Sequence, residues 1–285
     1  MEKRVTLILA FFLILLTALA GKAFYLQVIK ADDTITRALR RFDHSVAIAP
    51  HRGAINDRRG HPLAISLDVK SIAVDPRLIN DRGAAATKLS KALGLDRSVL
   101  RHRLNSGRHF VWIKRQVTPD EAAAVKALDM NGVVFLNEKK RYYPESESLA
   151  NILGIVGIDG TGLEGLELYY DKQLKGASSR VEVQKDGRGR IIYAQGLDRE
   201  LDLSKNGHTL GLTIDKRLQY VAYSTIKEAV TKNDARSGFV IMTNPYSGEI
   251  YAMANFPSFD PNIPRRHMIG HQNKAVTDMF EPGSI

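Results

Sequence analysis

The last residues of the chain hold the side chain best placed to do chemistry. Glu281-Pro282-Gly283-Ser284 comes just before the final Ile285, and proline and glycine followed by serine predict the start of a helix with serine at its cap. A serine hydroxyl is a weak nucleophile that needs a neighbouring base. At a helix N-terminus it would also gain from backbone N–H groups that stabilise developing negative charge. The Ser284 hydroxyl would therefore lie at the start of a helix, where it could act as a nucleophile only if the next turn carried a base.

Two other segments spell patterns of serine chemistry but favour simpler interpretations. Ser224-Thr225-Ile226-Lys227 places a lysine three residues after a serine, and both side chains fall on the polar side of an expected helix. Ser204-Lys205-Asn206 lies in a polar turn ahead of any candidate serine. We expect a solvated helix face in the first case and a boundary turn in the second.

Candidates for metal, acid–base and sugar-binding sites are also weak. His267 and His271 are four residues apart, but no H-E-x-x-H glutamate accompanies them, so a surface pair is expected. Nothing brings Asp57 and Glu164 together as paired carboxylates, and a turn or structural role is expected for Asp57. The single tryptophan, Trp112, is expected in the core or at an interface. The sequence therefore predicts no metal and no cofactor.

The composition is that of a globular chain with a basic surface. The 285 residues carry a net charge of +10, with 44% hydrophobic and 25% charged residues and no cysteine. The lack of cysteine excludes disulfides, thiolate metal sites and cysteine nucleophiles. The basic excess indicates anionic surroundings such as lipid head groups or a carboxylate-rich polymer, or simply a basic surface. No basic patch interleaved with aromatic residues indicates nucleic-acid binding.

The N-terminal residues predict an export and anchoring element. Glu2-Lys3-Arg4 precedes an apolar run, and a membrane-spanning helix needs roughly 20 mostly apolar residues. Val5–Leu26 meets that length if Lys22 reaches toward the interface, and the basic residues favour a cytoplasmic N-terminus. The alternative is a cleaved signal peptide, with Ala18-Leu19-Ala20 as the cleavage site. On both interpretations the rest of the chain is exported.

Local signals predict a mixed α and β organisation. Thr118 and Glu121 form the pattern of a capping box with Pro119 at the first helical position. The same T-x-x-E pattern at Thr161 predicts a helix that runs to about Leu174. A polar, turn-rich stretch over 196–207 predicts a domain boundary. Strands are expected at 45–49, 71–75, 110–113 and 209–214, helices at 84–93, 97–104 and 216–231, and hairpins at 181–193 and 239–255. Asp215 is expected to cap the last of these helices, and the two hairpins are expected to turn at Asp186-Gly187 and at 245–248.

Several segments, taken in order, resemble class B penicillin-binding proteins. Arg52–Gly60 resembles the R-G-x-I-x-D-R-x-G box, Arg141–Pro144 with 150–157 resembles R-x-Y-P…LG-x-VG, and Gly162–Glu167 resembles G-x-E-G-x-E. In this family these boxes build a non-catalytic pedestal. The resemblance therefore implies structural roles for Arg52, Gly53, Asp57, Arg58, Gly60, Arg141, Tyr143, Pro144, Gly154, Gly157, Glu164, Gly165 and Glu167.

The later segments resemble the start of the family's transpeptidase domain. Leu212–Asp215 with Gln219 is similar to L-T-I-D-x-x-x-Q, residues 245–262 resemble the first hairpin and loop, and residues 273–284 resemble the approach to the S-x-x-K serine. The implied fold is α+β. It has a transmembrane anchor over 1–30, an elongated pedestal of the dimerisation type over 31–205, and the incomplete start of an α/β transpeptidase domain over 206–285.

The resemblance also implies an activity, which is peptidoglycan D,D-transpeptidation. The T-D-x-F-E-P-G-S segment before Ser284 is most similar to the division-specific FtsI branch. Ser284 would attack the D-Ala-D-Ala carbonyl of a stem peptide and pass the acyl group to a neighbouring amine, and penicillin and other β-lactams would acylate the same serine. The implied location is the bacterial inner membrane, single-pass, with most of the chain in the periplasm or outside the cell. The implied partners are a SEDS-type glycosyltransferase and other divisome proteins, with no nucleic acid.

The sequence also departs from the family pattern. The S-x-x-K lysine would fall two places after Ile285, and the downstream S-x-N and K-T-G elements are not present. We therefore expect a chain cut just after its nucleophile and inactive by itself. The alternative hypothesis is a non-catalytic module, in which a membrane anchor and a pedestal bind divisome partners or the nascent wall.

Overall fold

The computed structural model describes residues 2–25, 43–48, 50–177, 179–185, 191–194, 206–263 and 270–279. The chain divides into two compact units, one formed by residues 1–48 and 179–203 and the other by residues 49–178 and 204–285. The first unit holds helix α1 (Glu2–Phe24) and a three-stranded sheet. The second unit holds the remaining elements.

The sheet of the first unit is antiparallel. Its order is β1 (Asp43–Ile48), β6 (Ser179–Lys185) and β7 (Ile191–Ala194). β1 pairs with β6 along its whole length, and β6 pairs with β7 as the hairpin predicted over 181–193 requires. The expected turn of that hairpin, at Asp186-Gly187, lies outside the described residues.

Helix α1 differs from the sequence-based expectation. The sequence predicts a membrane-spanning helix over Val5–Leu26, but within the described ranges no helix combines the length and the apolar character needed to cross a bilayer. α1 begins at Glu2 and ends at Phe24 with Lys22 in its last turn, and Leu26 lies outside the described residues. The predicted transmembrane helix is therefore not found in this part of the chain.

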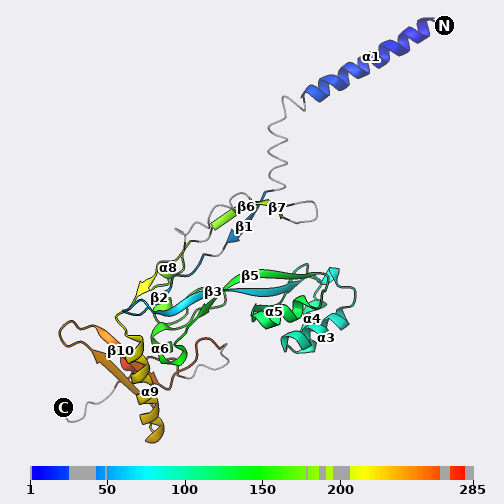
Figure 1. The fold of residues 1–285 in the computed structure, drawn as a ribbon. Coiled ribbons are helices and arrows are strands. Elements are labelled where there is room, and N and C mark those ends of the chain that lie inside the picture. The colour runs from blue at the N-terminus through cyan, green and yellow to red at the C-terminus, as the bar shows by residue number, and fades with distance from the viewer. Residues whose placement is uncertain are drawn as a thin grey trace. The chain divides into compact units, whose positions relative to one another are not determined.

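Strand β3 (Pro62–Val74) organises the second unit (Figure 1). It pairs antiparallel with β5 (Val133–Tyr142) along the full length of β5, and its C-terminal half pairs antiparallel with β4 (Val111–Val117). Its N-terminal end pairs with β2 (Ile55–Asn56), which also pairs in parallel with β8 (Leu210–Gly211). The sheet order is β4-β3-β2-β8, with β5 added to β3.

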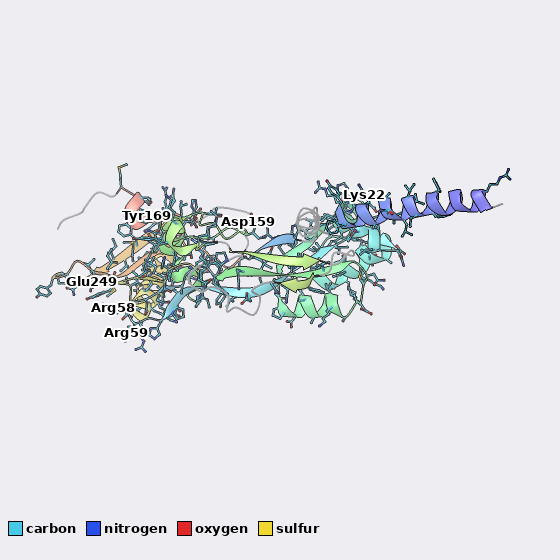
Figure 2. All side chains as sticks on the ribbon, turned by 90° about the horizontal axis from the view of Figure 1, so that it is seen from above. Lys22, Arg58, Arg59, Asp159, Tyr169 and Glu249 are labelled. Atoms are coloured by element: carbon cyan, nitrogen blue, oxygen red, sulfur yellow. The ribbon has the colours of Figure 1, made fainter. Side chains whose placement is uncertain are left out.

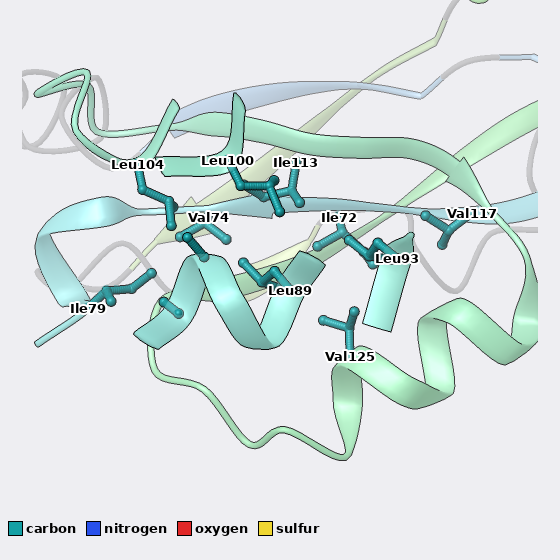
Figure 3. Packing of buried hydrophobic residues seen from close by; sticks show 12 residues of the cluster. Ile72, Val74, Ile79, Leu89, Leu93, Leu100, Leu104, Ile113, Val117 and Val125 are labelled. Atoms are coloured by element: carbon teal, nitrogen blue, oxygen red, sulfur yellow. The ribbon is translucent and has the colours of Figure 1, made fainter. Parts of the chain in front are cut away.

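Three helices supply the core that lies against β3 and β4. They are α3 (Arg82–Leu93), α4 (Arg97–Leu104) and α5 (Pro119–Lys126). Figure 3 shows Leu89 of α3 and Leu100 of α4 directed toward the side chains of the strands. Each fully buried leucine or isoleucine contributes on the order of 1.5–3 kcal/mol. The fully or almost fully buried members include Ile72, Val74, Leu89, Leu93, Leu100, Leu104, Ile113 and Val125.

Local capping explains why these helices begin where they do. The Asp81 carboxylate accepts hydrogen bonds from the backbone of α3, and Asp96 does the same for α4. At α5, the Glu121 N–H donates to the Thr118 hydroxyl at 3.2 Å and the Thr118 N–H donates to the Glu121 carboxylate at 3.1 Å. The predicted capping box is confirmed, as are the helices predicted over 84–93 and 97–104.

A second core lies around β2 and a group of short helices. These are α6 (Ala150–Leu153), α7 (Gly165–Tyr169) and α8 (Asp171–Leu174), and a 3₁₀ turn at Ser146–Ser148 precedes α6. Another 3₁₀ turn, at Pro76–Leu78, precedes α3. Their apolar side chains pack on the start of β3. The buried members are Ile55, Leu63, Ala64, Tyr143, Leu149, Leu153, Leu174 and Ile214.

The continuous helix predicted from Thr161 to Leu174 is wrong. Gly162 pairs with Val156 as an isolated bridge, and helical conformation begins only at Gly165. An ideal Cβ on Gly162 would lie 2.1 Å from the Glu167 carbonyl oxygen, so this segment is pressed against the helix that follows it. That tertiary contact overrides the T-x-x-E pattern.

The last part of the second unit is a helix packed on a hairpin. α9 (Lys216–Lys232) is capped by Asp215, as predicted, and the strands β9 (Gly238–Thr243) and β10 (Ile250–Phe256) form the predicted antiparallel hairpin. Ala222 and Tyr223 of α9 pack against the small residues of β10. A final short helix, α10 (Lys274–Thr277), follows.

Candidate functional site

A buried ion-pair cluster joins the three motif segments of the second unit. Arg52 Nε lies 2.6 Å from Glu167 Oε2, and Arg141 Nε lies 2.7 Å from Oε1 of the same carboxylate. The Glu167 side chain is fully buried, and those of Arg52 and Arg141 are 6% and 4% exposed. Moving one of the three segments away would leave a buried charge without its partner, which is strongly destabilising. The cluster therefore holds these segments in one arrangement.

Asp171 completes the cluster. Arg52 Nη1 donates to Asp171 Oδ1 at 2.7 Å and to the Gly160 carbonyl at 3.1 Å, while its Nη2 donates to the Glu167 carbonyl at 2.7 Å. Burial acts to raise the pKa of Asp171, but hydrogen bonds from the Gly162 N–H and from Arg52 outweigh it, so the pKa is lowered. Two guanidinium cations and two carboxylate anions thus balance one another.

Tyr143 connects this cluster to the loop after β10. Its hydroxyl lies 3.5 Å from Glu167 Oε1. Burial, together with the Glu167 carboxylate, raises the pKa of the Tyr143 phenol, which keeps it protonated. The backbone N–H and carbonyl of Tyr143 both bind the Asn262 side-chain amide at 2.9 Å. The R-x-Y-P segment therefore contacts both the pedestal motifs and the segment that leads toward Ser284.

Gly154 and Gly165 allow two backbone segments to touch. Gly154 has φ +76° and ψ −153°, a conformation that glycine alone adopts readily. An ideal Cβ on Gly154 would lie 2.0 Å from the Glu164 carbonyl oxygen, and one on Gly165 would lie 2.6 Å from the Gly154 nitrogen. The LG-x-VG and G-x-E-G-x-E motifs are thus packed backbone to backbone.

Asp57 fixes the start of α9. Its Oδ1 accepts from the N–H groups of Arg59 at 2.8 Å and His61 at 2.7 Å, and its Oδ2 accepts from the Lys216 N–H at 3.4 Å. Burial acts to raise the pKa of Asp57, yet these backbone donors prevail and the pKa lies below its usual value. The Asp57 carboxylate thus binds the backbone of its own turn and of α9, whereas Glu164 contacts a different group, His271.

The two arginines that follow Asp57 extend this attachment. The Arg58 N–H donates to the Ile214 carbonyl at 2.9 Å, and its guanidinium lies 4.2 Å from the ring centroid of Tyr251. Arg58 Nη2 also lies 3.7 Å from Glu249 Oε2, and both residues are labelled in Figure 2. Arg59 Nε lies 3.2 Å from the capping carboxylate of Asp215. The first motif box therefore holds both α9 and β10.

The remaining motif residues occupy turns or close contacts. Gly53 approaches the carbonyl of His208, since an ideal Cβ on it would lie 2.0 Å from that oxygen. Gly60 has φ +83° with open space beside it. The Gly157 N–H donates to the Thr161 carbonyl at 2.8 Å, and Pro144 lies half-buried in the turn after β5.

The segment that precedes Ser284 is held by side-chain amides. Asn255 Nδ2 donates to Asn273 Oδ1 at 2.9 Å, and Asn255 Oδ1 accepts from the Ala275 N–H at 3.0 Å. These bonds fix the start of α10 on β10. Ser284 itself, the predicted nucleophile, lies outside the described residues, so its hydroxyl remains a sequence-based prediction.

Comparison with known proteins identifies the family. The sequence pattern of the penicillin-binding protein dimerisation domain matches residues 47–212, more than half of the chain. The chain belongs to the penicillin-binding proteins. The pattern of the penicillin-binding protein transpeptidase domain matches residues 238–285, a range that includes Ser284. The family predicted from the motif boxes is confirmed.

Relatives of this penicillin-binding protein are named as enzymes. It is 36% identical over 282 residues to peptidoglycan D,D-transpeptidase FtsI of Buchnera aphidicola subsp. Schizaphis graminum, covering 96% of this chain and 48% of the relative. For FtsI of Escherichia coli K12 the identity is 36%, covering 99% and 48%. For the probable peptidoglycan D,D-transpeptidase PenA of Neisseria meningitidis Z2491 it is 35%, covering 99% and 49%. The chain spans about half the length of these relatives.

A solved structure supports the same architecture. A peptidoglycan synthetase from Bifidobacterium adolescentis superposes with a TM-score of 0.54 at 24% identity, covering 85% of this chain and 49% of that one. At this identity the match speaks for the fold alone. It agrees with the mixed α+β fold predicted for this penicillin-binding protein.

The other candidate sites of this penicillin-binding protein contact structural partners. Lys227 pairs with Glu147 at 3.1 Å, and the Ser224 hydroxyl donates to the carbonyl of Val221, so the exposed helix face predicted there is confirmed. Trp112 is half-buried and packs edge-to-face on Phe110.

The predicted turn and histidine pair are only partly described. Asn206 accepts from the His51 N–H at 3.0 Å, and Ser204 and Lys205 lie outside the described residues. His271 lies 3.6 Å from Glu164, and His267 also lies outside them. Across the described ranges, no group of three metal-ligating side chains is present.

Sequence reasoning missed several residues that complete this site. Asp171, which pairs with Arg52, is one of them. Gln219, by contrast, belongs to the L-T-I-D-x-x-x-Q pattern; it is fully buried and bonds the backbone of Met253 in both directions at 2.8 and 3.0 Å. Asn255 gave a usable signal, because asparagine is depleted in strands and lies here in the otherwise apolar Ala-Met-Ala-Asn-Phe. A polar residue in such a strand indicates a specific hydrogen-bonding role.

Proposed function

We propose that this chain supplies the N-terminal part of a septal peptidoglycan D,D-transpeptidase, with Ser284 as its nucleophile. The observation that carries the proposal is the 36% identity to two FtsI proteins over 96% and 99% of the chain. The transpeptidase match, over residues 238–285, includes the predicted serine. The proposed division-specific role is supported by the similarity to FtsI proteins and by the T-D-x-F-E-P-G-S motif before Ile285.

The proposed chemistry is serine acyl transfer. The Ser284 oxygen would bond to the carbonyl carbon of D-Ala-D-Ala in a stem peptide, and D-Ala would leave with the proton that the serine gives up. The amine of a neighbouring stem would then take the acyl group, and the serine would regain a proton. Penicillin would acylate the same oxygen. The base, a lysine one helical turn after the serine, would belong to the rest of the domain.

The parts of the chain are proposed to divide these tasks. Residues 31–205 would form the pedestal, with the cluster around Glu167 as its structural centre, and residues 206–285 would begin the transpeptidase domain. Divisome proteins and a SEDS-type glycosyltransferase are the proposed partners. The proposed division of labour is supported by the pedestal motifs, which contact one another in a buried cluster.

Labelling with a fluorescent penicillin tests the nucleophile. The form to be tested carries residues 1–285 followed by the rest of the transpeptidase domain as it occurs in the FtsI relatives. Ser284→Ala is expected to abolish labelling, because no acyl acceptor remains. Ser224→Ala is the matched control and should label normally. The 285-residue chain by itself, which does not carry the base lysine of the rest of the domain, should not bind the fluorescent penicillin covalently. Labelling that persists in Ser284→Ala would refute the assignment.

We also propose that α1 attaches the chain to the bacterial inner membrane, with the rest exported. Its side chains from Phe11 to Leu16, and Leu19, are exposed apolar groups, which water solvates poorly. In a flotation experiment with electrically neutral phosphatidylcholine vesicles, the whole chain should rise with the lipid, and a chain that lacks residues 1–30 should stay in the dense fraction. Equal flotation of both forms would contradict the attachment through α1.

A further inference from the structure

The segment just before α10 is also held by a residue of the pedestal motifs. Asn151 belongs to α6, within the stretch that resembles the family's LG-x-VG box. Its Nδ2 donates to the Gly270 carbonyl at 2.6 Å and to the Gln272 carbonyl at 3.0 Å. Both hydrogens of one amide group are thus used on two backbone oxygens more than a hundred residues away in sequence.

A second contact of the same kind lies beside it. Glu164 Oε1 lies 3.6 Å from Nδ1 of His271, the residue between the two carbonyls that Asn151 binds. Glu164 is part of the G-x-E-G-x-E segment, whose backbone packs on Gly154. Residues 270–272 are therefore bound by both the LG-x-VG and the G-x-E-G-x-E segments, which also contact each other.

On its other side the segment is bound to β10. Asn255 bonds Asn273 and the N–H of Ala275, and the Asn273 carbonyl accepts from the first turn of α10. The start of α10 is consequently fixed between a pedestal helix and a strand of the transpeptidase region. α10 ends at Thr277, a few residues before Ser284.

The chemistry of the Asn151 position is specific. Two carbonyl oxygens converge on one side chain, so that side chain must supply two hydrogens from one group, and a primary amide does so. An aspartate of nearly the same shape would present only acceptors to these carbonyls when ionised. Loss of both hydrogen bonds would free residues 270–272 without removing any apolar packing.

We propose that Asn151 is a positioning residue for the Ser284 nucleophile, acting through the carbonyls of Gly270 and Gln272. The inference rests on the proposed function. A displacement of about 1 Å at a reacting group can cost on the order of 100-fold in rate. The pedestal motif would thus set the rate of acylation through a direct contact with the approach segment.

Amide hydrogen exchange on the 285-residue chain tests the contact itself. In Asn151→Asp, the amides of residues 271–278 should exchange at least about tenfold faster, while those of β3 and α9 keep their rates. Asn80→Asp, at an exposed asparagine, is the matched control and should change neither region. Asn151→Ala removes the donors without adding charge and should give the same local pattern. Faster exchange spread over β3 and α9 would mean a purely structural role and overturn the proposal, as would no change.

Acylation kinetics then test the consequence. In the form with the complete transpeptidase domain, Asn151→Asp should lower the first-order acylation constant for penicillin by about tenfold or more, with the dissociation constant of the non-covalent complex nearly unchanged. The label should still be found on Ser284. An unchanged acylation constant overturns the proposal. If Ser284→Ala still labels, the proposed function fails, whereas the exchange result stands by itself.

Discussion

Replacing Glu167 by glutamine is expected to lower the free energy of unfolding of the second unit by about 3–5 kcal/mol. The carboxylate lies between the guanidinium groups of Arg52 and Arg141 at 2.6 and 2.7 Å and is fully buried. Glutamine keeps the shape but removes the charge, so two cations remain with only Asp171 to balance them. Urea unfolding followed by the fluorescence of Trp112, the single tryptophan, measures the loss.

A matched control separates burial from charge. Asp159 pairs with Arg115 at 2.9 Å, but its side chain is 78% exposed. Asp159→Asn should therefore change stability by less than about 1 kcal/mol. If Glu167→Gln were as mild as this control, the two arginines would have to find other partners, and the cluster would not be the structural centre of the pedestal.

Replacing Gly154 by alanine is expected to lower the free energy of unfolding by a comparable amount. An alanine at φ +76°, ψ −153° is strained by about 1–3 kcal/mol. Its Cβ would also lie 2.0 Å from the Glu164 carbonyl oxygen, and overpacking of this kind adds about 1–3 kcal/mol or more. We expect a loss of about 3–5 kcal/mol, seen as a lower urea midpoint or a lower yield of soluble chain.

Gly60→Ala isolates the backbone-conformation part of that effect. Gly60 has φ +83° but nothing within 4 Å of an added Cβ, so only the backbone conformation is penalised, by about 1–2 kcal/mol. The difference between the two variants reports the contact between the LG-x-VG and G-x-E-G-x-E motifs. If both variants lost the same free energy of unfolding, the backbones of the two motif segments would be able to move apart without destabilising the fold.

Elements with local signals were predictable from the sequence. The cap at Asp215, the capping box at Thr118 and the hairpin at 245–248 each depend on residues a few positions apart, so sequence alone specifies them. The family boxes likewise singled out Arg52, Arg141 and Glu167, for which the resemblance implies structural roles. The boxes could not show that these three side chains meet, because the contacts span up to 115 residues of sequence.

Elements defined by tertiary contacts were missed. β5 contains Asn-Glu-Lys-Lys-Arg in its second half and lacks the alternation of a half-buried strand, yet it pairs with β3 along its whole length. The helix expected from Thr161 failed because Gly162 packs on Glu167. Asn151 resembled any polar residue on a short helix, and only its contacts with Gly270 and Gln272 give it a role.

Strand β3 gives the second unit a mechanical property. Leu63 and Ala64 near its start lie in one hydrophobic core, and Ile72 and Val74 near its end lie in the other. Because it runs as one strand of 13 residues, a slip of one residue would turn the side chains at both ends toward the wrong face. We therefore expect β3 to transmit force along its length. A force applied to helices α3, α4 and α5 would pass along this continuous strand to the Asp57 turn, which binds the start of α9.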